Sequence, residues 1–475
     1  MSDKSTQLAI IGGGPGGYAA AFLAADLGLE VTLVDPEANP GGVCLYRGCI
    51  PSKTLLHAVK VIAEARSGSE WGLSFKDLSV DTKALRKWKD KVVAQLTEGL
   101  GQLVKRRKIT HIRGTAVFKD DKTLEIEDLE GGKSTLAFEN AVIATGSRAV
   151  TLPMFAEAGD RVWTATRALD LEEVPDRLLV VGGGYIGLEL GSVYAGLGSK
   201  VSVVEMTPDL LPGVDRDLVR FLQKRLSNLF EEIQLETKVT AAKGQKNGVK
   251  VTIEDKKGEE QNRLFDKVLV AVGRRPRSEG LGLEAIGVET DDEGFIRVDD
   301  QRRTSVSHIL AIGDVAGQPM LAHKASHEGR VAVEAIAGQK VAFDPLAIPA
   351  VVFTDPEIAW AGPTEAEAKA QGLSYEVARF PWGASSRAAT VGAPDGLTKL
   401  LVDPDSETVI GVGIVGSGAG ELIAEGTLAI EMGANATDLG LTIHPHPTLS
   451  ETLMEAAHVF HGIAAHYYKP KRKKK

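Results

Sequence analysis

The chain alternates short apolar runs with glycine turns and with longer stretches of mixed apolar and polar residues, a pattern typical of alternating strands and helices. Residues 8–17, LAIIGGGPGG, and residues 178–187, LLVVGGGYIG, are apolar runs that enter glycine turns. Each turn precedes a helix-like stretch and then a second apolar run, which ends at Asp35 in the first copy and at Glu205 in the second. The pattern therefore predicts two copies of a strand–turn–helix–strand unit.

A second pair of apolar runs supports an internal repeat. Residues 138–146, FENAVIATG, match residues 265–273, FDKVLVAVG. The glycine turns lie 170 positions apart and these later runs 127 apart, so the first half contains 43 extra residues. We predict an α/β fold with two doubly wound, Rossmann-like domains and an insertion in the first.

The two glycine turns predict dinucleotide sites, because each GxGxxG follows a strand and opens a helix, with an acid 18 residues after its third glycine. The first glycine permits the tight turn, the second lets the backbone approach a pyrophosphate, and the third lets the helix pack on the strand. The helix N-terminus then presents N–H groups to the phosphates, and the acid can bind a ribose hydroxyl. Glycine turns without a ligand are the alternative. The predicted residues are Gly12, Gly14, Gly17 and Asp35 in the first site, and Gly182, Gly184, Gly187 and Glu205 in the second.

The second site is predicted to bind NAD rather than NADP. Glu205 would repel a 2'-phosphate, and the segment that follows it, MTPDLLP, contains no arginine to receive one.

Composition is that of an ordinary soluble protein of about three domains. Of the 475 residues, 43% are hydrophobic and 25% are charged, with a net charge of -9. This balance argues against binding to nucleic acid or to a membrane surface. The basic end, YYKPKRKKK, is predicted to be disordered from residue 469 to residue 475. With no apolar run of spanning length and no signal-peptide pattern, we expect a cytoplasmic protein.

Both cysteines of the chain, Cys44 and Cys49, lie in the segment GGVCLYRGCIPSK at residues 41–53, inside the predicted insertion. A structural disulfide is improbable in a reducing cytoplasm, and two thiolates without further Cys or His ligands make a weak metal site. Redox chemistry is favoured, with two buried bystander thiols as the alternative. A cofactor that mediates between thiols and NAD suits the adjoining first site, and flavin is the cofactor that does so.

Taken with HILAIGDV at residues 308–315 and HPHPTLSE at residues 444–451, these motifs resemble the flavin disulfide oxidoreductases, or pyridine nucleotide-disulfide oxidoreductases, over essentially the whole chain. The resemblance is closest to members that oxidise protein-bound dihydrolipoyl groups with NAD. It implies one tightly bound FAD per subunit in the first site and NAD as co-substrate in the second. It further implies a homodimer formed through a C-terminal α+β domain. The implied partners are lipoylated acyltransferases or glycine-cleavage carrier proteins.

The resemblance also assigns roles to single residues. Cys44 would be the interchange thiol that meets the substrate, and Cys49 the thiol that contacts the flavin. A helix beginning near Pro51 would direct its positive end toward both. His446 and Glu451 match the family's acid–base pair. Without the resemblance, the two histidines of this loop would be interpreted as surface residues or as a turn.

A further set of residues is implied to bind the cofactors. Lys53 would lie near the flavin and be held by Glu189, which we group with the NAD residues, although a surface lysine and an unrelated helical glutamate are the alternative. Tyr185 occupies the position that covers the nicotinamide pocket in several relatives, and Asp314 would bind the ribityl chain. The remaining predicted residues are Gly114, Thr145, Gly146 and Ser147 at the FAD site and Gly273 at the NAD site.

The predicted domains follow from these motifs. Residues 1–150 and 277–346 would form the FAD-binding and central parts, residues 151–276 the NAD-binding domain, and residues 347–468 the dimerisation domain. The competing interpretations are a related NAD(P)H-dependent flavin disulfide reductase and a non-catalytic flavoprotein subunit. The intact Cys44, Cys49, His446 and Glu451 argue against the non-catalytic subunit.

Overall fold

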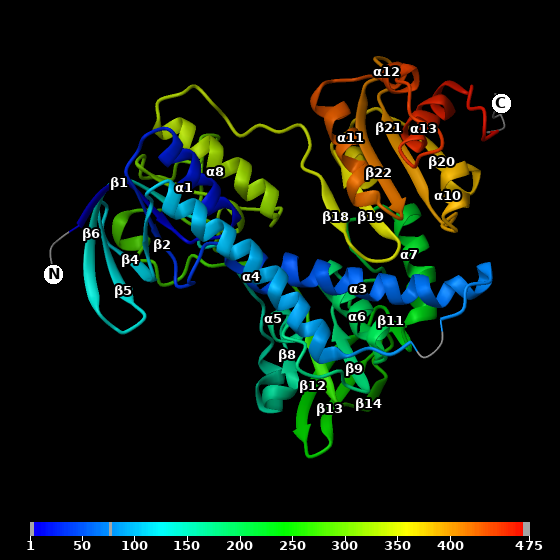
Figure 1. Cartoon of the computed structure of the whole chain (residues 1–475), viewed down its shortest axis with the longest axis horizontal. Coiled ribbons are helices and arrows are strands. Elements are labelled where there is room, and N and C mark those ends of the chain that lie inside the picture. Colours follow the sequence, from blue (N-terminus) through cyan, green and yellow to red (C-terminus); the bar gives the residue numbers. More distant parts are fainter. Residues whose placement is uncertain (1–3, 76–77, 469–475) are drawn as a thin grey trace.

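The computed structural model describes residues 4–75 and 78–468, so the predicted basic tail at residues 469–475 lies outside the described residues. Three lobes are visible in Figure 1, and the long helices α3 (Cys49–Ser67) and α4 (Thr82–Arg106) run between them. Among the helices of the described part, none is long and apolar enough to cross a membrane.

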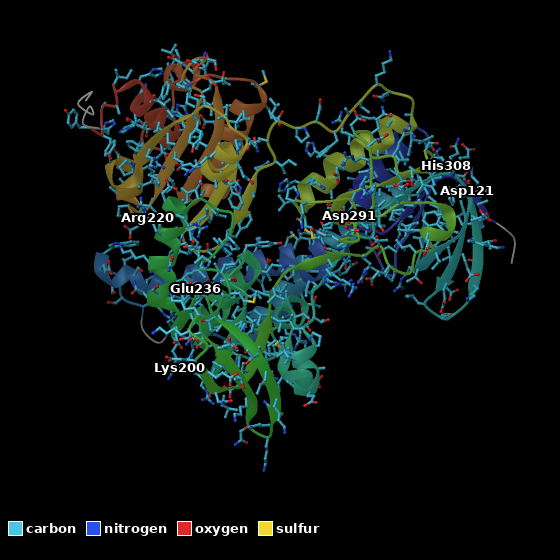
Figure 2. All side chains as sticks on the ribbon, turned by 180° about the vertical axis from the view of Figure 1, so that it is seen from behind. Asp121, Lys200, Arg220, Glu236, Asp291 and His308 are labelled. Carbon is cyan, nitrogen blue, oxygen red and sulfur yellow. The ribbon has the colours of Figure 1, made fainter. Side chains whose placement is uncertain are left out.

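The first lobe is built on a seven-stranded sheet whose central strand β1 pairs in parallel with β2 and β6. In sheet order the strands are β3 (Thr110–Ile112), β2 (Val31–Val34), β1 (Lys4–Ile11), β6 (Lys133–Ile143), β5 (Thr123–Asp128) and β4 (Gly114–Asp120), with β17 (Ile309–Ala311) paired to β6. Helices α1 (Pro15–Asp26) and α8 (Ala322–Ile336) pack side by side on this sheet (Figure 1). At the edge of the lobe, His308 Nε2 lies 2.6 Å from the backbone oxygen of Asp121, which ties the loop before β17 to the β4–β5 turn (Figure 2).

The second lobe repeats the strand order of the first. Its five-stranded parallel sheet consists of β11 (Glu232–Gln234), β10 (Lys200–Val204), β9 (Arg177–Val181), β15 (Lys267–Val270) and β8 (Val162–Trp163). The helices of this lobe are α5 (Ala165–Leu169), α6 (Tyr185–Leu197) and α7 (Arg216–Leu229). A separate antiparallel sheet contains β12 (Lys238–Gln245), β13 (Gly248–Glu254) and β14 (Glu260–Phe265). Since β9 pairs with β10 and β15 as β1 pairs with β2 and β6, the predicted internal repeat is confirmed.

The third lobe is α+β, as predicted. Its antiparallel sheet runs β18 (Ala350–Val352), β19 (Glu357–Ala361), β22 (Val409–Gly416), β21 (Leu397–Val402) and β20 (Glu376–Pro381). Its helices are α9 (Glu365–Ala370), α10 (Ser386–Thr390), α11 (Ala419–Glu431), α12 (Ala436–Leu441) and α13 (Glu451–His461).

Short elements complete the chain and join the lobes. They are α2 (Gly42–Arg47), β7 (Ser147–Ala149) paired with β16 (Arg274–Pro276), and the 3-10 turns η1 (Gly68–Trp71), η2 (Pro153–Arg161), η3 (Glu284–Ile286), η4 (Gly313–Val315) and η5 (Trp382–Ala384).

A buried lysine joins the second lobe to the third. Lys399 on β21 is 1% exposed, and its Nζ lies 2.6 Å from Asp215, 2.8 Å from Asp217 and 2.8 Å from Glu365. Such a buried ammonium requires carboxylate partners, and two of these three come from the start of α7 in the second lobe. The three carboxylates stand close enough to hold a metal ion, but the ammonium of Lys399 already occupies the place between them.

Candidate active site

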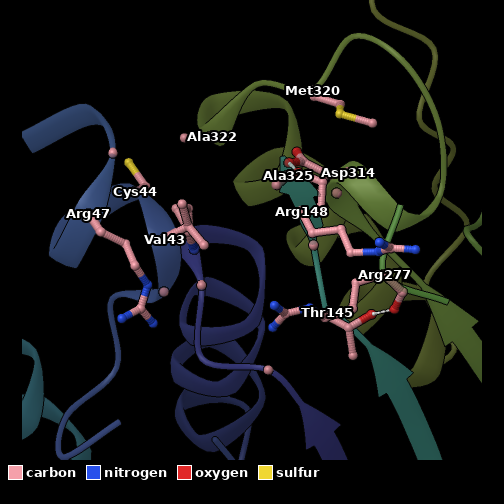
Figure 3. Close-up of a pocket in the computed structure, with 18 of the residues that line it drawn as sticks. Val43, Cys44, Arg47, Thr145, Arg148, Arg277, Asp314, Met320, Ala322 and Ala325 are labelled. Atoms are coloured by element: carbon pink, nitrogen blue, oxygen red, sulfur yellow. Dashed lines mark hydrogen bonds between the residues drawn. The ribbon is translucent and has the colours of Figure 1, made fainter. Parts of the chain in front are cut away.

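A cavity of about 680 Å³ opens where the first and second lobes meet. The turn after β1, the helices α2 and α3, the segment around β7, the turn η4 and the first turns of α6 all line it. Figure 3 shows Cys44, Val43 and Arg47 on one side of the cavity, with Asp314, Arg148 and Arg277 on the other. The predicted FAD residues that line this cavity are Gly12, Gly14, Asp35, Lys53, Gly114, Thr145, Gly146, Ser147 and Asp314, together with both cysteines.

The backbone of the first glycine turn leaves room for a phosphate group. A Cβ on Gly12 would lie 2.3 Å from the oxygen of Ala144, and a Cβ on Gly17 only 1.9 Å from the oxygen of Gly12. A Cβ on Gly14 would meet nothing within 4 Å, so this face is open to the cavity at the N-terminus of α1. The Asp35 carboxylate accepts a hydrogen bond of 2.6 Å from the N–H of Gly13 and braces the turn. These residues fit the pyrophosphate and ribose of a dinucleotide.

The second glycine turn has the same geometry. A Cβ on Gly182 would lie 2.4 Å from the oxygen of Ala271, and a Cβ on Gly187 would lie 2.2 Å from the oxygen of Gly182. A Cβ on Gly184 would meet nothing within 4 Å. Glu205 accepts a hydrogen bond of 2.6 Å from Gly183, and Gly273 has a φ of +123° with nothing near its Cβ position. The turn therefore fits a second dinucleotide, and it lies outside the 680 Å³ cavity.

The cysteine pair lies on two successive helices. Cys44 belongs to the short helix α2, and α3 begins at Cys49, two residues before the start predicted near Pro51. Proline is tolerated in the first turn of a helix, where its missing N–H has no acceptor, so α3 extends past it to the cysteine. Gly48 separates the two helices, and a Cβ there would lie 2.8 Å from the oxygen of Val43.

The two cysteines are thiols in this structure, and one hydrogen-bonds the other. The hydrogen bond from Cys44 lowers the pKa of Cys49 to about 7, with further help from the positive charge of Lys53 and against the effect of burial. The same hydrogen bond raises the pKa of Cys44, because that sulfur holds the shared proton. Cys49 is therefore the sulfur of the reduced pair that loses its proton more readily.

The predicted pairing of Lys53 with Glu189 is confirmed. Lys53 Nζ lies 2.8 Å from Glu189 Oε2, and the Glu189 side chain is only 4% exposed. Glu189 and Tyr185, which we grouped with the NAD residues, both line the first cavity. Helix α6 thus contributes to both halves. It starts at the second glycine turn, and residues of its first two turns line the cavity that contains the cysteines.

Arg274 is a residue that the sequence analysis missed. Its Nε donates a hydrogen bond of 2.7 Å to Ser147 Oγ, and Ser147 in turn donates to the carboxylate of Asp314. Arg274 lines the cavity and directly follows the predicted Gly273. Its position next to a glycine of the internal repeat is the sequence feature from which it could have been predicted as a site residue.

A buried ionic network holds the turn that contains Asp314. The N–H of Gly313 donates a hydrogen bond of 2.6 Å to Glu328, which is fully buried. Lys324 and Arg302 neutralise that carboxylate, each at 3.0 Å. None of these three charged residues was predicted. Lys324 and Glu328 are four residues apart on α8, but Arg302 and Gly313 lie outside that helix, and only the fold brings them to Glu328.

The predicted acid–base pair lies in the third lobe, outside the cavity. His446 Nδ1 is 2.9 Å from Glu451 Oε1, and the His446 side chain is 62% exposed. Partial burial acts to raise the pKa of Glu451, but hydrogen bonds from the N–H of Thr448 and from His446 outweigh it and hold the pKa below its ordinary value. The other histidine of this loop, His444, has a side chain that is only 4% exposed, and its Nε2 lies 2.7 Å from Glu425 Oε1.

Comparison with known proteins gives matches along the whole chain. A family model described as pyridine nucleotide-disulphide oxidoreductase matches residues 6–329, and the dimerisation domain of the same family matches residues 348–457. A protein of Vibrio cholerae named dihydrolipoyl dehydrogenase is 50% identical over 469 residues, which are 99% of this chain and 98% of that protein. One of the same name from Haloferax volcanii is 47% identical over 464 residues, 97% of each chain. The crystal structure of LpdA from Mycobacterium tuberculosis superimposes with a TM-score of 0.89 at 27% identity, covering 96% of this chain and 99% of that one.

Proposed function

Because this chain belongs to the pyridine nucleotide-disulphide oxidoreductase family, we propose that it oxidises protein-bound dihydrolipoyl groups to the lipoyl disulfide and reduces NAD to NADH. The observation that carries the proposal is the hydrogen-bonded cysteine pair in the wall of a cavity that both dinucleotide halves line. Relatives that are named dihydrolipoyl dehydrogenase and are 50% identical to this chain indicate the substrate class.

The first cavity would hold FAD and the second glycine turn would hold NAD. FAD, when bound, supplies a two-electron acceptor that can pass a hydride to NAD. The residues that would hold FAD are Gly12, Gly14, Gly17, Asp35, Lys53, Gly114, Thr145, Gly146, Ser147 and Asp314. Those that would hold NAD are Gly182, Gly184, Tyr185, Gly187, Glu205 and Gly273, while Glu189 acts through Lys53.

The thiol chemistry begins at Cys44. A substrate thiol gives its proton to His446 of the partner subunit, and the thiolate attacks the Cys44 sulfur of the oxidised pair. A mixed disulfide forms, and Cys49 leaves as a thiolate. The second substrate thiol attacks the substrate sulfur bound to Cys44, which closes the lipoyl disulfide and releases Cys44, and its proton passes to the Cys44 sulfur. The pair then holds two electrons, with Cys44 as the thiol and Cys49 as the thiolate, in agreement with the directions of their pKa shifts.

A homodimer is part of the proposal. The chain contains the family's dimerisation domain, and the exposed His446 lies outside the cavity formed by its own chain. A second copy would bring His446 and Glu451 to the cysteines. Lipoylated acyltransferases or glycine-cleavage carrier proteins are the proposed partners, and the cytoplasmic location stays a prediction.

NAD is preferred to NADP in this proposal. Glu205 directly follows β10, and both of its carboxylate oxygens accept backbone hydrogen bonds. The exposed residue after it is Met206 rather than an arginine. A carboxylate there disfavours a 2'-phosphate, which is also why an NADPH-dependent disulfide reductase is the weaker alternative.

The test is the initial rate of NAD reduction, and separately of NADP reduction, by free dihydrolipoamide. We expect a rate with NAD that falls about a thousandfold or more in Cys44→Ser, because the interchange sulfur is then missing. Flavin-containing protein that lacks this rate but oxidises NADH with another disulfide or with oxygen would overturn the substrate assignment.

A further inference from the structure

Phe353 connects the third lobe to the cysteine site through two contacts. It follows β18 directly, and its N–H donates a hydrogen bond of 3.0 Å to Glu189 Oε1. Its ring centroid lies 4.5 Å from Lys53 Nζ. Glu189 thus uses one carboxylate oxygen for Phe353 and the other for Lys53, and the lysine lies between a carboxylate and an aromatic face.

These contacts matter because of where Lys53 stands. Cys49 and Lys53 are four residues apart on α3, so they lie on the same face of that helix. A lysine side chain is long and flexible, and this one is 31% exposed, so a single carboxylate does not by itself prevent it from turning toward water. The ring of Phe353 covers the ammonium on a second side, and the attraction between a cation and an aromatic face opposes that movement.

We propose that Phe353 is a positioning residue that holds Lys53 beside Cys49 and so makes the charge of the cysteine site depend on the docking of the third lobe. The role of Cys49 in turnover rests on the proposed function, whereas the position of Lys53 relative to the thiol does not. Lys53 and Glu189 were predicted as a pair, but Phe353 stands 164 residues from Glu189 and has no motif of its own.

The charge at Cys49 has other determinants, which the test must hold constant. Cys44, Lys53 and Glu189 act on the pKa of Cys49. The phenols of Tyr18 and Tyr185 also face this thiol. Cys44 is replaced by serine in every variant that the experiment compares, and substitutions at Phe353 leave the other four residues in place.

The experiment uses the flavin-loaded Cys44→Ser protein, in which Cys49 is the single remaining thiol. The rate of its alkylation by iodoacetamide is measured against pH by mass spectrometry, and the midpoint reports the pKa of the thiol. In this background we expect Phe353→Leu to raise the midpoint by about half to one pH unit, because Lys53 no longer stays near the thiolate. Phe353→Tyr keeps the ring and is expected to keep the midpoint, and Lys53→Met is expected to raise it at least as far as Phe353→Leu.

Two controls separate positioning from general loosening of the fold. Phe22→Leu removes an equivalent ring from Arg107, at 4.8 Å, away from the cavity, and is expected to leave the midpoint unchanged. When Lys53→Met is already present, Phe353→Leu is expected to add no further shift, because both changes act through the same ammonium.

The proposal is overturned if Phe353→Leu leaves the midpoint unchanged while Lys53→Met raises it, or if Phe353→Leu shifts the midpoint equally with and without Lys53. If the leucine variant does not fold, Phe353→Met is judged by the same criteria. Alkylation requires no dihydrolipoyl substrate, so a failure of the proposed function would not produce either result.

Discussion

The turn after β1 and the turn after β9 use glycine in the same three ways. In each turn, a Cβ on the first glycine would meet the backbone that follows a neighbouring strand, and a Cβ on the third would meet the backbone of the first glycine. A Cβ on the second glycine would meet nothing within 4 Å. Each turn is braced by an acid that accepts a 2.6 Å hydrogen bond, Asp35 from Gly13 and Glu205 from Gly183. The two halves therefore offer nearly the same backbone to a pyrophosphate, and the turns alone do not distinguish their ligands.

The surroundings of the two turns differ. The first half carries the insertion with α2, α3 and α4, and its turn opens into the cavity with the cysteines. In the second half the hairpin strands β12, β13 and β14 form a sheet of their own, whereas β4, β5 and β6 extend the main sheet of the first. A shared nucleotide-binding unit thus acquires its chemistry from the segments packed beside it, which agrees with the general separation of fold from function.

The largest expected effect concerns His446, the proposed base, which lies outside the cavity of its own chain. His446→Gln is expected to lower kcat/KM for dihydrolipoamide by about 10²- to 10⁴-fold, the usual contribution of a general base. Oxidation of NADH by ferricyanide, which bypasses the thiols, should stay within about twofold, since His446 belongs to neither of the two proposed nucleotide sites. Initial rates with the two acceptors measure this difference.

Mixed dimers test whether the base comes from a second subunit. Combining His446→Gln subunits with Cys44→Ser subunits should restore activity, because one of the two sites then has both an intact cysteine pair and an intact histidine. Mixed dimers as inactive as either parent would contradict the shared site.

Sequence patterns predicted those parts of the site whose residues lie close together along the chain. The glycine turns, the acids at the strand ends and the adjacent cysteines all lie within short segments, and the structure places each as the periodicity indicates. The pairing of Lys53 with Glu189 and that of His446 with Glu451 came from the family resemblance. Their geometry is confirmed.

Residues that work across lobes could not be predicted in this way. Arg274 reaches Ser147 over 127 positions, and Phe353 reaches Glu189 over 164. Such contacts depend on how whole lobes dock, for which periodicity along the chain holds no information. The start of α3 at Cys49 was missed for a local reason, because proline is favoured as the first helical residue and here stands third.

An intermediate effect is expected when the middle glycine of either turn becomes alanine. Gly14 and Gly184 have φ values of -69° and -78°, and a Cβ would meet nothing within 4 Å, so both variants should fold. The added methyl would occupy the space that the pyrophosphate needs. We expect Gly14→Ala to be purified with little flavin, and Gly184→Ala to keep its flavin but to raise KM for NAD about tenfold or more, the loss of about 1.4 kcal/mol of binding.

Flavin absorbance per subunit and KM for NAD distinguish the two halves. Gly17→Ala is the matched control, because its Cβ would lie 1.9 Å from the oxygen of Gly12 and should destabilise the fold itself. Loss of flavin from Gly184→Ala at an unchanged melting temperature would mean that the two turns do not serve separate nucleotides.

The smallest expected effect comes from neutralising the bracing acids. Glu205→Gln keeps the shape of the side chain but removes the charge that accepts backbone N–H groups at 2.6 Å and 2.8 Å. Hydrogen bonds to a charged group are stronger than neutral ones, so KM for NAD should rise about three- to tenfold with kcat little changed. Discrimination against NADP should also weaken, since the repulsion of a 2'-phosphate is gone.

Asp35→Asn, which removes the equivalent charge from the first turn, should instead speed the release of flavin at constant KM for NAD, as followed by flavin fluorescence after dilution. If each substitution changed both measurements alike, the two acids would be acting on the fold shared by the halves rather than on separate ligands.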